Sequence, residues 1–93
     1  MKRSYAVVWS DGDTLGSGRL DACGDRFELH GRDTQVSIPF SEVAGASIAR
    51  RHVDRLRGLP VLLLRRSDRE PVRIASLEGP GVLHELARHV AAV

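Results

Sequence analysis

Three arginines have the type and the spacing to bind an anion. Arg65 and Arg73 fall at outward positions of two strands predicted over Val61–Arg66 and Val72–Ser76, and Arg51 ends an earlier strand beside them. Because guanidinium groups pair with phosphates and carboxylates, these three residues form a predicted site for RNA, DNA or an acidic partner. The alternative is that the arginines form a solvated face whose positive charge is offset by nearby carboxylates. The absence of an aromatic residue between the arginines, which could stack on bases, favours this alternative.

The histidines do not have the spacing of a metal site. His84 and His89 are separated by an interval that places them about 140° apart around a helix, so they cannot chelate one ion. His30 and His52 fall on different predicted elements, and no second ligand lies at a recognisable spacing from either. We therefore predict no metal site and no cofactor.

The chain also lacks the convergent groups that an enzyme needs. Cys23 is the only cysteine, which excludes a disulfide within the chain, and no histidine lies at a spacing that suggests a base for its thiol. Asp11-Gly12-Asp13 has two ligands of a calcium loop without the others, and Gly16-Ser17-Gly18 lacks the later glycine of a dinucleotide-binding motif. We interpret the first as a turn and the second as a flexible hairpin end, and we predict that the chain is not an enzyme.

Two segments, Ala6–Trp9 and Val61–Leu64, are apolar on both alternating faces. A strand covered on one side only would alternate apolar and polar residues. Val61 and Leu63, at the outer positions of the second segment, are therefore candidate interface residues. The C-terminal helix, a second copy of the chain or a partner protein would cover them. A small barrel can also bury such a strand where it closes.

The elements that must position these residues are seven short antiparallel strands in a meander, predicted from period-two alternation between Gly, Asp and Pro turns. The strands are predicted over Tyr5–Trp9, Arg19–Ala22, Arg26–His30, Thr34–Ile38, Ala46–Arg51, Val61–Arg66 and Val72–Ser76. From Gly81 onward apolar residues recur with the period of a helix, and Pro80 suits its first turn. This pattern predicts a mainly β fold, a barrel or sandwich capped by one C-terminal α-helix.

Several of these segments follow one another as they do in a known family. The segments are Gly18-Arg19-Leu20, Arg26-Phe27-Glu28-Leu29, Val36 to Val43, Gly58 to Leu64 and Val72-Arg73-Ile74. With the closing helix, they resemble a bacterial pleckstrin-homology-like (PH-like) domain of the kind related to GRAM domains, over roughly residues 16–93. The resemblance implies seven antiparallel strands with one capping helix. It rests on apolar spacings, so it transfers no ligand residue.

Binding of phosphoinositides is not expected. PH domains that bind these lipids concentrate Lys and Arg in the first inter-strand loop, where several cations surround the phosphates. The corresponding loop here, Ser10 to Gly18, contains Asp11 and Asp13 and no cation. The like charges would repel a phosphate, so this departure from the family argues against a lipid-phosphate site there.

Length and charge set the remaining limits. A chain of 93 residues has room for one domain, predicted over residues 1–93, and its net charge of +2 is too small to imply a polyanion partner by itself. The N-terminal apolar run stops at Asp11, short of a signal peptide, and no window is long enough to span a bilayer. With one cysteine, a reducing cytoplasm is the expected location.

These observations favour a non-catalytic module that binds another protein or another copy of itself, through its apolar strand surfaces or the groove beside its terminal helix. A homo-oligomer is consistent with this hypothesis. The alternative function is binding of an anion or a nucleic acid through the arginine-rich face. Salt would separate the two, because binding through phosphates weakens steeply with ionic strength whereas an apolar interface does not.

Overall fold

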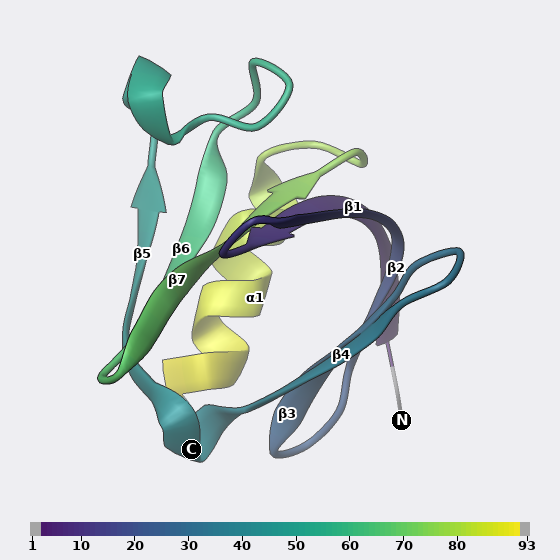
Figure 1. Ribbon diagram of the computed structural model, residues 1–93, viewed down its shortest axis with the longest axis vertical. Coiled ribbons are helices and arrows are strands. Elements are labelled where there is room, and N and C mark those ends of the chain that lie inside the picture. Colours follow the sequence, from purple (N-terminus) through teal and green to yellow (C-terminus); the bar gives the residue numbers. More distant parts are fainter. Residues whose placement is uncertain (1–2, 92–93) are drawn as a thin grey trace.

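Seven strands and one helix make up residues 3–91, the part of the chain that the computed structural model describes (Figure 1). The strands are β1 (Arg3–Asp11), β2 (Thr14–Ala22), β3 (Arg26–His30), β4 (Gln35–Pro39), β5 (Val43–Ala49), β6 (Val61–Arg66) and β7 (Arg69–Ser76). The helix α1 spans Gly81–Ala91. Two short 3-10 turns, η1 (Phe40–Glu42) and η2 (His52–Asp54), precede and follow β5.

The first strand lies at the centre of one antiparallel sheet, whose order is β4-β3-β2-β1-β7-β6-β5. β1 pairs with β2 on one side and with β7 on the other. β4 and β5 follow each other in the chain but lie at opposite edges, joined through η1. As Figure 1 shows, the sheet curls into a half-barrel with α1 across its open side. The predicted fold class, seven antiparallel strands with one C-terminal helix, is confirmed.

The core fills the concave side of the sheet beneath the helix. Inward residues of the strands alternate with outward ones, as they must in a sheet with one buried face. Phe27 and Phe40 meet edge to face with ring centroids 4.8 Å apart, and Leu83 and Leu86 of α1 are fully buried. The helix packs against β5, β6 and β7. Within residues 3–91 no helix has the length and apolar character needed to cross a membrane.

The predicted bounds of the third and sixth strands are confirmed, but those of the second are wrong. β2 begins at Thr14, so Gly16-Ser17-Gly18 is part of the strand and not a flexible hairpin end. The segment lacks apolar alternation, but it still pairs with β1 through backbone hydrogen bonds. Trp9 of β1 lies opposite Gly16 in this pairing. A glycine is needed there to leave room for a large side chain, a requirement that periodicity does not reveal.

The fifth strand also differs from its prediction. β5 ends at Ala49, so Arg51 lies outside the sheet, in the loop that leads into η2. At the other end β5 begins at Val43, directly after η1, whose Phe40 is buried. The connection between the fifth and sixth strands therefore starts earlier than the predicted strand bounds imply and includes Arg51, which was assigned to the sheet.

Candidate functional site

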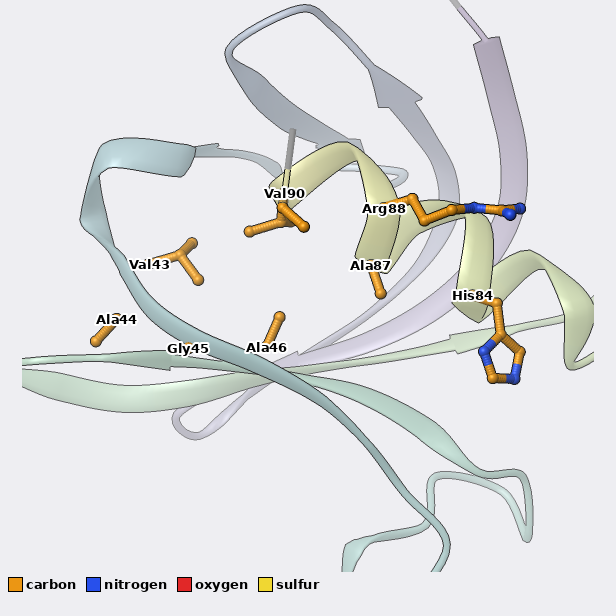
Figure 2. Close-up of a pocket in the computed structure, with 9 residues that line it drawn as sticks. Val43, Ala44, Gly45, Ala46, His84, Ala87, Arg88 and Val90 are labelled. Carbon is orange, nitrogen blue, oxygen red and sulfur yellow. The ribbon is translucent and has the colours of Figure 1, made fainter. Parts of the chain in front are cut away.

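A groove runs between the first half of β5 and the outer side of α1 (Figure 2). Its volume is about 600 Å³, and its lining residues are Val43, Ala44, Gly45, Ala46, His84, Ala87, Arg88, Val90 and Ala91. In Figure 2 Val43 and Ala46 face Ala87 and Val90 across the opening, while Arg88 extends away from β5. The space between strand and helix is therefore apolar on both walls.

The strand wall of the groove is an edge of the sheet. β5 pairs with β6 on one side only, so alternate backbone N–H and C=O groups point away from the sheet. The side chains along this edge are small, and the pairing with β6 shifts by one position between Val43 and Gly45. Small side chains keep the edge accessible, which is the condition for another extended segment to pair with it.

One arginine lines the groove, and a second lies behind its strand wall. Arg88 is exposed on α1, and Arg65 of β6 lies over Gly45 on the outer face of the sheet. A Cβ atom on Gly45 would lie 3.1 Å from Arg65 Nη2, so the glycine leaves space for this guanidinium. The nine lining residues include an arginine and no carboxylate. An acidic group on an occupant would therefore meet opposite charge at this end of the groove.

The predicted arginine site is not brought together as one open stripe. Arg65 is exposed, but Arg73 is partly covered: its Nη2 lies 3.9 Å from Asp54 Oδ1 in η2, which folds over it. Arg73 lies opposite Leu63 on β6 and Ser10 on β1. Arg51 is exposed in the preceding loop. Arg65 and Arg73 thus lie on the outer face in different settings, Arg51 lies in the loop outside the sheet, and the role of the three residues in binding stays a prediction.

Sequence reasoning missed the stronger basic feature, the loop over residues 50–57. Its exposed basic side chains are Arg50, Arg51, His52, Arg55 and Arg57, and its one acid, Asp54, is engaged with Arg73. Arg55 fixes the loop by donating to the backbone oxygens of Arg50 (2.9 Å) and Gly58 (3.3 Å). The signal was present in the sequence as closely spaced basic residues, but only Arg51 of this segment was considered as an anion-binding residue.

The two candidate interface residues also differ. Val61 is fully buried in a second, smaller apolar cluster with Val8 and Ala75, and Leu56 and Leu59 pack against that cluster. The outer face at Val61 is therefore covered by the chain's own loop, which was not among the covers considered from the sequence. Leu63 is half-buried on the same face. Of the two residues, only Leu63 is accessible to a partner, because Val61 is buried within the chain. An interface role for this strand stays a prediction.

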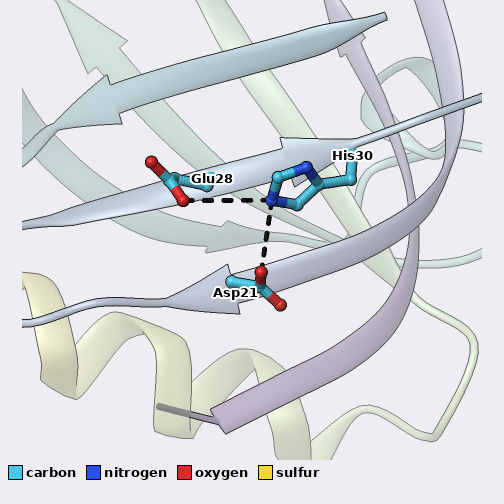
Figure 3. Close-up of side chains that lie close together, drawn as sticks. All are labelled: Asp21, Glu28 and His30. Carbon is cyan, nitrogen blue, oxygen red and sulfur yellow. Dashed lines mark ion pairs between the residues drawn. The ribbon is translucent and has the colours of Figure 1, made fainter. Parts of the chain in front are cut away.

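A polar cluster on the outer face of β2 and β3 was not predicted (Figure 3). His30 Nε2 lies 3.2 Å from Asp21 Oδ2 and 3.9 Å from Glu28 Oε1. Asp21 is buried, at 1% exposure, and Glu28 lies directly opposite it across the hairpin. His30 was considered only by its spacing along the chain, whereas the proximity of the three residues depends on the register of the hairpin.

Comparison with known proteins identifies the fold. No model of a known protein family matches the sequence, and neither does any curated protein. Among solved structures, the Vps36 N-terminal PH domain superposes with a TM-score of 0.73 at 16% identity, covering 98% of this chain and 80% of that one. The C-terminal domain of an unknown protein from Leishmania infantum matches with a TM-score of 0.71 at 13% identity, covering 96% of this chain and 82% of that one. The chain therefore has the fold of a PH domain.

Proposed function

We propose that this chain is a non-catalytic module that binds an extended segment of a partner protein in the groove between β5 and α1. The segment would pair with the free edge of β5 and place alternate side chains against α1. The observation that carries the proposal is the coincidence of an open sheet edge with an apolar groove along the same strand. Backbone pairing would supply affinity, and the groove would select side chains.

The chemistry of the groove defines the segment. Val43, Ala46, Ala87 and Val90 present small apolar surfaces, which suit an apolar side chain of moderate size at every second position. Arg88 at the helix side favours an acidic residue on the part of the segment that lies beside it. The expected ligand is therefore an extended peptide that alternates apolar and polar residues and carries at least one carboxylate.

Selection from a displayed library of random peptides on the immobilised full chain tests this function. We expect enrichment of peptides with the alternating, acidic pattern, and loss of their binding in Ala87→Gln, whose longer side chain fills the groove. The matched control is Ala6→Gln, the same change at an exposed position of β1. Thermal unfolding of both variants checks that they fold.

Two results would overturn the proposal. Peptides that bind Ala87→Gln as well as the wild type would place the ligand elsewhere. A dimer detected by light scattering, dissociated by Ala87→Gln and unaffected by Ala6→Gln, would identify the occupant as a second copy of this chain. Self-association would then replace binding of a partner protein as the function of the groove.

Binding of a nucleic acid is a second candidate, favoured by the exposed basic residues of the loop over residues 50–57. A fluorescent single-stranded oligonucleotide titrated at several salt concentrations tests it. Electrostatic binding should weaken steeply with salt, because it releases counterions. Binding should also be lost in the variant Arg50→Glu, Arg51→Glu, and weakened in Arg65→Glu if the sheet face contributes. Retained binding in the double variant would exclude the loop as the site.

A further inference from the structure

The outer face of the β2–β3 hairpin gathers nitrogen and oxygen donors within a small volume. Asp21 and Glu28 are directly paired across the two strands, and His30 lies two residues beyond Glu28 on the same face. Their donor atoms all lie within 4.8 Å of one another (Figure 3). Cys23 is outside this group: its Sγ lies 4.0 Å from Glu28 Oε1, but Cys23 is beyond Asp21 on the side away from His30. The donors come from one hairpin, so their spacing is fixed by cross-strand pairing.

The distances are close to those of a tetrahedral zinc site. Zinc bonds of about 2.0–2.3 Å in tetrahedral geometry place neighbouring ligand atoms about 3.3–3.7 Å apart. His30 Nε2 lies 3.2 Å from Asp21 Oδ2 and 3.9 Å from Glu28 Oε1. The donor atoms of Asp21 and Glu28 lie within 4.8 Å of each other, so side-chain adjustments of up to about 1 Å would bring the three atoms to ligand distance.

Neighbouring groups orient both carboxylates toward the same centre. Asp21 Oδ1 accepts hydrogen bonds from Ser4 Oγ at 2.6 Å and from Arg19 Nε at 2.9 Å, while Oδ2 faces His30. Glu28 Oε2 accepts from Arg26 Nε at 3.0 Å, while Oε1 faces His30 and Cys23. Supporting contacts of this kind hold ligands in place in known metal sites.

We propose that Asp21, Glu28 and His30 bind a zinc ion on the hairpin, with water as the fourth ligand. An imidazole with carboxylate donors suits Zn²⁺, whereas Ca²⁺ requires six to eight oxygen ligands. The prediction of no metal site rested on spacing along the chain. Cross-strand pairing brings together residues that such a search does not connect.

Titration of the full chain with Co²⁺ and then Zn²⁺ tests the site. We expect one Co²⁺ per chain, with visible bands of tetrahedral coordination that disappear when Zn²⁺ displaces the cobalt. His30→Gln should weaken Zn²⁺ binding at least about tenfold, as should Glu28→Gln. Zinc should also raise the Tm of the wild type, because it binds the folded state.

The matched control is His52→Gln, which removes an exposed histidine from η2 and should leave Zn²⁺ affinity unchanged. Circular dichroism of each variant checks that the sheet is retained. Two outcomes would overturn the proposal. Wild-type chain that binds no zinc would identify the cluster as an ion-pair network. Equal loss in His52→Gln would place the ion elsewhere.

Discussion

The indole ring of Trp9 lies directly on the backbone of Gly16. The two residues are cross-strand partners in β1 and β2, and a Cβ atom on Gly16 would lie 2.2 Å from Cε2 and Cζ2 of the ring. The ring extends to Gly31, where an added Cβ would lie 3.2 Å from Cη2. Trp9 is 1% exposed, so the glycines form the surface against which the largest side chain of the core packs.

Gly16→Ala is expected to destabilise the fold, because the ring must move to accommodate a methyl group. Overpacking of this kind costs about 1–3 kcal/mol in the free energy of unfolding. Urea unfolding followed by the fluorescence of Trp9, the single tryptophan, measures it. Gly24→Ala is the control: no heavy atom lies within 4 Å of an added Cβ there, so the change should stay within about 0.5 kcal/mol. Equal losses in both variants would contradict the packing seen here.

The single tyrosine should ionise above its ordinary pKa. Burial raises the pKa of Tyr5 above 10.0, and the hydrogen bond that its hydroxyl donates to Glu85 Oε2 at 2.9 Å raises this pKa further. Phenolate absorbance during an alkaline titration reports this group alone. Glu85→Gln should lower the midpoint, because it removes a negative charge beside the phenolate. A wild-type midpoint at or below 10.0 would contradict this environment.

The same pKa shift has a consequence for stability at high pH. A raised pKa means that the folded state holds the phenol proton more tightly than the unfolded state does. The stabilisation is complete below about pH 10 and is lost as the pH rises through the folded-state pKa. Tyr5→Phe should therefore flatten the decline of unfolding free energy in that alkaline range. An unchanged slope would show that other groups cause the decline.

Much of the fold could be predicted from alternation, because most strands have one buried and one outward face. β3 and β6 were bounded correctly since Phe27 and Leu29, or Leu62 and Leu64, mark the inner face without interruption. The bounds of β2 could not be predicted in this way. Its first half requires small residues beneath Trp9 and not alternating apolar ones. Steric demand from a cross-strand neighbour leaves no periodic signal.

The sites were harder to predict, because they depend on register and on loops. Only the pairing of β2 with β3 shows that Asp21, Glu28 and His30 adjoin. The cover of Val61 comes from a loop whose path alternation does not describe. Arg73 was correctly placed on the outer face, yet η2 brings Asp54 to it. Contacts made by irregular segments therefore account for most of what the sequence did not show.

An ion pair links the first hairpin to β6. Arg66 Nη2 donates to Asp11 Oδ1 at 2.7 Å and also to the backbone oxygen of Glu70, and the Arg66 side chain is only 5% exposed. Asp11→Ala should leave this charge without its carboxylate and cost about 1–3 kcal/mol. Chemical denaturation measures the loss. Asp13→Ala, an exposed change in the same turn, should have a much smaller effect, and similar losses would argue against the pair.

The cover over β6 predicts how Val61 responds to substitution. Val61→Thr preserves shape but places a hydroxyl in an apolar cluster at 0% exposure, which should destabilise the isolated chain by about 1–3 kcal/mol. Val53→Thr is the same change at 81% exposure and should leave the unfolding free energy unchanged. If a partner protein and not the loop covered Val61, both variants would unfold like the wild type in the isolated chain. Denaturant unfolding of the three proteins therefore distinguishes a residue that supports the fold from one that waits for a partner.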